Sequence, residues 1–204
     1  ILGWAGLGLQ LFLTLVLLRS QDGTALDGIW RYLGYFTVIA NIFAAFVLTL
    51  AAIGRSAPRR EFAAATAMVL IGVTYSLLLR QTWNPQGLQK LADIALHDAM
   101  PLLVALFWLL RPHGALGGRD LAACMILPLA YCLYALARGA AEGWYPYDFL
   151  DLARLGAADL VRNCLYFTAG FLAMACGLLL LDRALATRRG CSAEIGRASG
   201  RERG

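Results

Sequence analysis

YFTVIANIFAAFVLTLAAI, residues 35–53, is a nearly unbroken apolar run. About 20 such residues in an α-helix are enough to cross the hydrocarbon core of a bilayer. The run nevertheless carries Thr37 and Asn41, which lie one helical turn apart near its start. The stretch therefore predicts a membrane helix, and it raises the question of what two polar side chains do there.

Five further apolar runs accompany this one, and the six in order are residues 1–18, 34–53, 62–80, 94–110, 120–137 and 161–181. The fourth run is the shortest and contains His97 and Asp98. The chain of 204 residues is 60% hydrophobic, which is unusual for a soluble domain. Only helices and closed barrels satisfy their backbone in lipid, and these runs lack the alternation of barrel strands. We therefore predict an all-α polytopic membrane protein, a six-transmembrane-helix bundle.

The connections between the runs are short, so the bundle leaves no room for a second domain. We expect one transmembrane domain over residues 1–182 and a disordered basic C-terminal tail over residues 183–204, which are polar and rich in glycine. The first run lacks the basic start and small-residue cleavage site of a signal peptide, so we interpret it as a retained helix.

The charge and cysteine content exclude several classes of protein. The net charge is +5, but the basic residues sit at helix ends, so we expect no nucleic-acid partner. The five cysteines show no CxxC spacing, and His97 is the one histidine near a helix, so no metal site is expected. There is no glycine-rich phosphate loop, and we expect no cofactor. The expected partners are membrane lipids or a lipid-ester substrate, whereas the oligomeric state stays open.

The distribution of basic residues predicts an orientation. Of the 18 Lys and Arg residues, eleven fall on the side of the two termini and seven on the other. The positive-inside rule then places both termini in the cytoplasm. Nearly all of these residues are Arg, which is typical of a GC-rich bacterial gene, so we expect the bacterial cytoplasmic (inner) membrane.

Polar residues gather at the outer ends of five of the six runs. The inner ends carry little beyond flanking Arg and Asp182. Polar side chains in membrane helices usually face the bundle interior or water, so the asymmetry predicts a site in the outer leaflet. The residues at the outer ends are Thr37, Asn41, Tyr75, Ser76, Arg80, His97, Asp98, Tyr131, Tyr134, Arg138, Asp159, Arg162 and Asn163.

Three of these residues and the outer loop also have simpler interpretations. The Thr37 hydroxyl can bond the carbonyl four residues before it, and Asn41 can pack between helices. His97 can be an isolated histidine at the interface. The outer loop 138–160, which contains Trp144, Tyr145 and Tyr147, is either an interfacial cap or a lid over a site. The shared depth of the polar residues favours a site.

The chemistry that this group predicts is nucleophilic. A hydroxyl nucleophile needs a base within hydrogen-bond reach, and Thr37 and His97 lie at similar depths on separate helices. Pro101 has no N–H, so the carbonyl of His97 loses its helical partner, which favours a wet, widened cavity. Asp98 points about 100° away from His97 on a helix and is a poor choice to orient its ring.

The remaining candidates have supporting roles. Asn41 or Tyr75 can donate to an oxyanion, and Arg80 or Arg138 can hold a carboxylate or phosphate head group. Asn163, Gly170 and Gly177 follow a seven-residue step that predicts close packing of the last helix. The expected substrate-binding residues are Asn41, Tyr75, Arg80, Tyr134, Arg138 and Asn163, beside the expected catalytic residues Thr37 and His97.

The stretches YFTVIANI, LHDAMPLL and YPYDFLDL resemble the six-helix membrane proteins related to the androgen-induced gene family. The resemblance spans roughly residues 30–182. Animal members are intramembrane threonine hydrolases that cleave fatty acid esters of hydroxy fatty acids. The resemblance implies that Thr37 is the nucleophile and His97 its histidine, and the Asn41 position matches the bacterial pattern.

We therefore expect an intramembrane threonine-dependent hydrolase of lipid esters, a carboxylic ester hydrolase with its Thr–His pair near the outer leaflet. The alternative is a non-catalytic membrane transporter or lipid-binding protein. Transporters often carry internal repeats and broken helices at the bilayer midplane, whereas the polar residues here lie off-centre.

Overall fold

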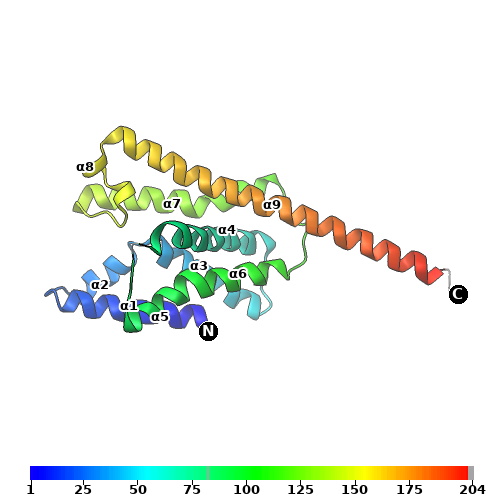
Figure 1. The fold of residues 1–204 in the computed structure, drawn as a ribbon, viewed down its shortest axis with the longest axis horizontal. Coiled ribbons are helices and arrows are strands. Elements are labelled where there is room, and N and C mark those ends of the chain that lie inside the picture. The colour runs from blue at the N-terminus through cyan, green and yellow to red at the C-terminus, as the bar shows by residue number, and fades with distance from the viewer. Residues whose placement is uncertain (82, 202–204) are drawn as a thin grey trace.

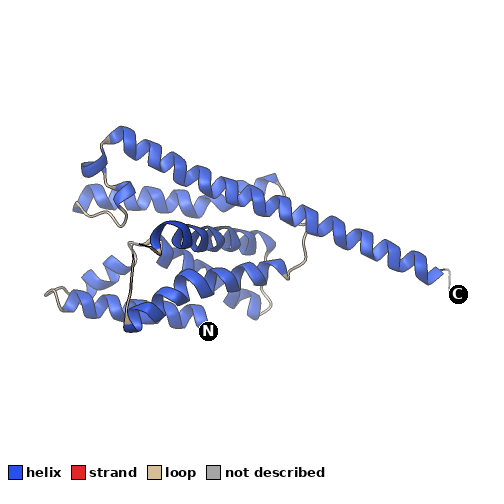
Figure 2. Ribbon diagram, viewed as in Figure 1, coloured by secondary structure: helices blue, strands red, loops and turns tan. Residues whose placement is uncertain are grey.

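The structure is a computed structural model that describes residues 1–81 and 83–201, with side chains up to residue 187. Every element in this part of the chain is helical (Figures 1 and 2). The elements in order are α1 Leu2–Arg19, α2 Ala25–Tyr32, α3 Phe36–Ala52, α4 Pro58–Thr74, η1 Tyr75–Leu79, α5 Gly87–Ile94, η2 Ala95–Ala99, α6 Met100–Leu109, α7 Gly118–Glu142, η3 Asp148–Leu150, α8 Leu152–Leu155 and α9 Ala157–Arg201.

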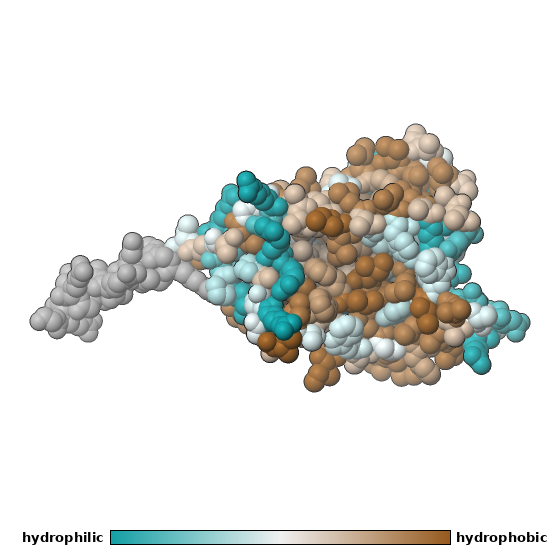
Figure 3. Space-filling view, turned by 180° about the vertical axis from the view of Figure 1, so that it is seen from behind, coloured by the Kyte–Doolittle hydropathy of each residue, from teal (hydrophilic) through white to brown (hydrophobic). Residues whose placement is uncertain are grey.

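The predicted polytopic bundle is confirmed. Five helices are long and apolar enough to cross a membrane, and the bent pair of α2 and α3 makes a sixth span if it is counted as one. The face shown in Figure 3 carries an apolar belt between two more hydrophilic ends, which is the pattern of a bilayer-spanning surface. The start of α1 and the end of α9 point toward the same end of the bundle (Figure 1).

The second span is bent where the sequence analysis expects a loop. An amphipathic helix, α2, precedes α3 at an angle of 79° and begins with a capping box between Thr24 and Asp27. Gly34 lies at the bend, and a Cβ there would approach Trp144 Cζ3 at 2.7 Å and Arg138 Nη1 at 2.8 Å. Only glycine therefore allows these side chains to pack against the bend, which fixes where α3 begins.

Two of the spans contain π-helical segments at the same end of the bundle. The end of the α4 span is the segment η1, and η2 joins α5 to α6 just before Pro101. A π-helical turn leaves backbone groups without α-helical partners and is frequent at functional sites. The span that contains η2 begins at Gly87, ahead of the predicted start at residue 94, so Asp93 lies inside it.

The helix α9 packs on a face that the sequence analysis does not predict. Its buried residues include Phe171, Ala175 and Leu179, whereas a Cβ at Gly170 or Gly177 would meet no atom within 4 Å. The predicted close packing along the glycine step is therefore wrong. The helix continues past residue 182, and the predicted division there into a transmembrane domain and a disordered tail stays a prediction.

The end of the bundle toward which the start of α1 and the end of α9 point holds more buried charge than the sequence analysis expects. Three carboxylates are buried there, and each has a partner that carries or can accept a positive charge. Because the opposite charges are paired and each pair joins different parts of the chain, these contacts stabilise the packing of the bundle. The pairs are Glu61 with Arg111, Asp120 with Arg59, and Asp182 with His113.

Candidate functional site

Two cavities meet at the end of the bundle opposite the two termini. The first, about 380 Å³, has a mainly apolar wall but is the more polar of the two. Its wall includes Gln10, Thr14, Gln89 and Asp93, and we call it the polar cavity. The second, about 720 Å³, is mainly apolar and lies between α4, η1 and α9. Both cavities are lined by Thr37, Tyr75, Leu79, His97, Pro146 and Tyr147.

Thr37 and His97, the two predicted catalytic residues, are therefore brought together at the junction of the two cavities. Thr37 lies in the first turn of α3, directly after the bend. In the simpler interpretation, the Thr37 hydroxyl would bond the carbonyl four residues before it, which is that of Leu33. That carbonyl accepts a hydrogen bond from the Tyr134 hydroxyl at 3.3 Å. Among the described residues no hydrogen bond joins Thr37 to His97, and such contacts are often looser in a site without substrate.

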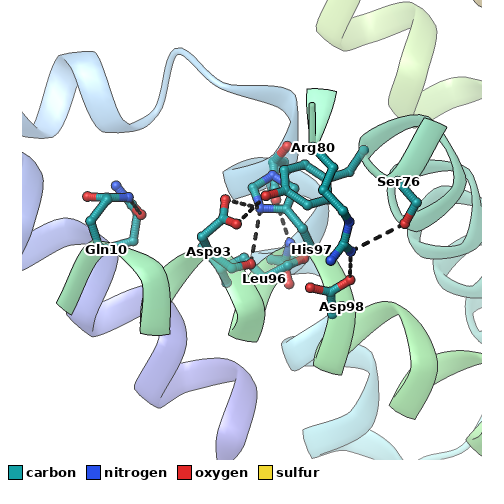
Figure 4. Close-up of polar contacts among 11 residues, drawn as sticks. Gln10, Ser76, Arg80, Asp93, Leu96, His97 and Asp98 are labelled. Atoms are coloured by element: carbon teal, nitrogen blue, oxygen red, sulfur yellow. Dashed lines mark hydrogen bonds and ion pairs between the residues drawn. The ribbon is translucent and has the colours of Figure 1, made fainter. Parts of the chain in front are cut away.

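His97 is oriented by a residue that the sequence analysis misses. Its Nδ1 lies 3.1 Å from Oδ1 of Asp93 and 3.2 Å from the Asp93 carbonyl oxygen (Figure 4). The Asp93 side chain is only 6% exposed, and its other carboxylate oxygen accepts from the Tyr75 hydroxyl. The Tyr75 ring stacks on the imidazole with centroids 4.2 Å apart. A carboxylate only accepts hydrogen bonds, so Nδ1 carries the hydrogen and Nε2 is left as the base.

The signal for Asp93 is present in the sequence. Asp93 and His97 are four residues apart, which puts both on one helical face. The hydropathy run that begins at 94 leaves Asp93 in a loop and hides this pair. Asp98 forms an ion pair with Arg80, so it does not orient the His97 ring (Figure 4).

Asn41 joins two helices and lines neither cavity. Its Nδ2 donates to the carbonyl of Thr37 at 2.8 Å and to the carbonyl of Leu96, in η2, at 3.2 Å. The residue is 0% exposed, and its Oδ1 has no hydrogen-bond partner among the described residues. Both amide hydrogens are engaged, which favours the packing interpretation over an oxyanion donor.

Arg80 and Arg138 also lie outside the walls of both cavities. Arg80 pairs with Asp98 beside η1. The Arg138 guanidinium donates to the Trp30 carbonyl at 2.6 Å and to Glu142 at 3.0 Å. It lies 4.3 Å from the ring centroid of Trp30 and thereby holds the bend between α2 and α3. The expectation that one of these arginines lines the cavity with Thr37 and His97 is therefore wrong.

Of the expected substrate-binding residues, only Tyr75 lines the cavities. Tyr134 bonds the Leu33 carbonyl and accepts from Arg138, so it belongs to the bend. Asn163 donates to the carbonyl of Phe149 at 3.1 Å and ties the outer loop to α9. Depth alone groups these residues with the site, but their side chains point elsewhere.

A different arginine, Arg31, lines the polar cavity. It comes from α2, and its Cζ lies 4.1 Å from the ring centroid of Trp144. The sequence analysis includes Arg31 only in the count of basic residues on the side away from the termini, because α2 is not among the apolar runs. Its position makes it the cation best placed to hold an anionic head group.

The outer loop closes over the site through Pro146 and Tyr147. The Tyr147 oxygen accepts from the N–H of Phe36, the residue directly before Thr37, at 3.1 Å. Burial raises the pKa of the Tyr147 hydroxyl above its ordinary value. The loop is therefore a lid over the cavities rather than a cap at the interface alone.

Within the described residues, no group of three His, Cys, Asp or Glu side chains is able to hold a metal ion. Comparison with protein-family models, with curated proteins and with solved structures finds no match for this chain.

Proposed function

We propose that the protein is an intramembrane hydrolase of lipid esters, in which Thr37 is the nucleophile, His97 the base and Asp93 the residue that positions His97. One observation carries the proposal. A hydroxyl and an imidazole face the same two cavities, and the imidazole is hydrogen-bonded through Nδ1 to a buried carboxylate. This combination is the recurring arrangement by which enzymes activate a hydroxyl nucleophile.

The reaction proceeds in two steps. In the first, His97 Nε2 takes the proton of Thr37, whose oxygen attacks the ester carbonyl carbon and forms a tetrahedral intermediate. The intermediate expels the alcohol, which receives the proton from His97, and an acyl-threonine remains. In the second step, His97 takes a proton from water, whose oxygen attacks the carbonyl carbon of the acyl-threonine and forms a second tetrahedral intermediate. The bond to the Thr37 oxygen then breaks, this oxygen receives the proton from His97, and the carboxylic acid leaves.

The two cavities suit the two halves of such an ester. The apolar cavity is lined by α4, η1 and α9, where Leu78 and Tyr166 are largely exposed, so an acyl chain can enter from the bilayer. The polar cavity suits the alcohol half, with Gln10 and Gln89 as hydrogen-bonding groups and Arg31 for an acid group. A fatty acid ester of a hydroxy fatty acid, which the family resemblance implies, has both halves. We place the site in the outer leaflet of the bacterial inner membrane, with both termini cytoplasmic.

The test is hydrolysis of a panel of lipid esters by the purified protein in liposomes, together with labelling by a fluorophosphonate probe. Thr37→Ala and His97→Ala should remove most turnover, and Thr37→Ala should also abolish labelling. Thr37→Ser retains the hydroxyl and should retain part of the activity. If folded Thr37→Ala hydrolyses esters as fast as the parent, the proposal is wrong. If the parent cleaves no ester, a non-catalytic transporter or lipid-binding protein is the better function.

A further inference from the structure

The proposed reaction needs a hydrogen-bond donor for the oxyanion of the tetrahedral intermediate, because loss of such a donor typically costs 10²–10³ in rate. Neither donor expected from the sequence is free. Both amide hydrogens of Asn41 bond backbone carbonyls. The Tyr75 hydroxyl donates to Asp93. The donor must therefore come from another residue that lines the junction of the cavities.

Tyr147 meets the geometric requirement. It lines both cavities together with Thr37, and its hydroxyl is bonded to the N–H of Phe36, the residue directly before the nucleophile. The helix α3 has no side-chain cap of its own. The Tyr147 oxygen takes that place by accepting from the Phe36 N–H at 3.1 Å. This bond holds the phenol at the nucleophile.

The same contacts prepare the phenol as a donor. The Tyr147 hydroxyl accepts a hydrogen bond from an N–H at a helix N-terminus, which polarises it. The polarised O–H is a stronger hydrogen-bond donor. Burial raises the pKa of Tyr147, so the group keeps its proton at neutral pH. Aromatic neighbours restrict the ring, since Tyr35 and Phe149 have centroids 6.1 Å and 5.3 Å from it.

We propose that Tyr147 is a third catalytic residue, whose hydroxyl donates a hydrogen bond to the ester carbonyl oxygen as Thr37 attacks. The proposal rests on the proposed hydrolase function. No bond to Tyr147 forms or breaks, because its proton stabilises the oxyanion and stays on the phenol. The outer loop thus supplies the third residue of the site.

The test is Tyr147→Phe, which removes only the hydroxyl oxygen and its hydrogen. We expect kcat for a long-chain lipid ester to fall by about 10²-fold while KM changes little, because the donor acts on the transition state. A long-chain trifluoromethyl ketone, which forms an oxyanion adduct with a hydroxyl nucleophile, should lose affinity by a similar factor. Tyr145→Phe is the matched control in the same loop, since Tyr145 lines neither cavity.

The outcomes separate this proposal from the proposed function. If the parent is active and Thr37→Ala inactive, but Tyr147→Phe keeps the parent's kcat and ketone affinity, the Tyr147 proposal is wrong and the hydrolase stands. A fall in thermal stability with no change in either quantity means that Tyr147 only caps α3, which also overturns the proposal. If the parent hydrolyses no ester, both proposals fall together.

Discussion

Asp93 provides the sharpest test of the site at the level of single residues. We expect Asp93→Asn to lower kcat by about 10²- to 10⁴-fold with little change in KM, because an amide no longer fixes the His97 tautomer or stabilises the imidazolium. The measurement is steady-state ester hydrolysis in liposomes. A shift of KM with unchanged kcat would mean that Asp93 binds substrate rather than positions the base.

Asp98→Asn is the matched control for this substitution. Asp98 neighbours His97 in sequence but pairs with Arg80, and it lines neither cavity. It should therefore retain most of the parent's activity. Equal losses of activity in the two variants would show that Asp93 acts through its negative charge near the site and not by orienting the His97 ring.

Arg31 is the residue that should determine which head group is accepted. For esters whose alcohol half carries a free acid, Arg31→Gln should raise KM by about tenfold, equivalent to ~1.4 kcal/mol. The corresponding methylated acid should show no such change. Arg162→Gln is the control, because Arg162 is exposed and pairs with Asp159 away from both cavities. Equal effects on the free and methylated acids would contradict this role.

The two residues that matter most to the proposal can be predicted from sequence, and several of the others cannot. Thr37 and His97 stand out because each is a polar group at a similar depth in an apolar run. Arg80 and Arg138 share that depth, yet their side chains pair with Asp98 and Glu142 outside the cavities. Depth follows from counting along a helix, whereas the direction in which a side chain points depends on helix rotation and on neighbours.

At the scale of elements, hydropathy finds the long apolar helices and misses the amphipathic ones. The helices α2 and α5 are amphipathic and carry polar residues among the apolar ones, so neither belongs to the long apolar runs. Both contribute to the site, through Arg31 and Asp93 respectively. The π-helical segments are also beyond prediction, although Pro101 indicates that the backbone near His97 is irregular.

Asn41 should stabilise the packing of α3 on η2. Asn41→Ala leaves the Thr37 and Leu96 carbonyls without this donor, which should cost about 1–3 kcal/mol of unfolding free energy. Thermal unfolding in detergent measures the effect. Asn163→Ala, which removes a single bond to the Phe149 carbonyl at the outer loop, should cost less. If Asn41→Ala instead keeps its stability and loses kcat by 10²-fold, Asn41 is an oxyanion donor after all.

For the molecule as a whole, the prediction concerns which end faces the cytoplasm. We predict that the end with the cavities faces outward, because more basic residues lie on the side of the termini. In a variant without native cysteines, Gln86→Cys should react with an impermeant thiol reagent in intact cells. Arg55→Cys, at the opposite end, should react only after the cells are opened. The reverse pattern would invert the orientation and place the site in the inner leaflet.

The two π-helical segments suggest how such a site arises in a bundle of regular helices. A π-helical turn commonly reflects the insertion of one residue into an α-helix, which shifts the later side chains by about 100°. Both η1 and η2 border the junction of the cavities, since Tyr75 lies in one and His97 in the other. In genetic terms, two single-codon insertions can convert a helix-packing interface into a cavity lined by the proposed catalytic residues. A relative that lacks one residue within 75–79 or 95–99 should then keep the bundle and lose the chemistry.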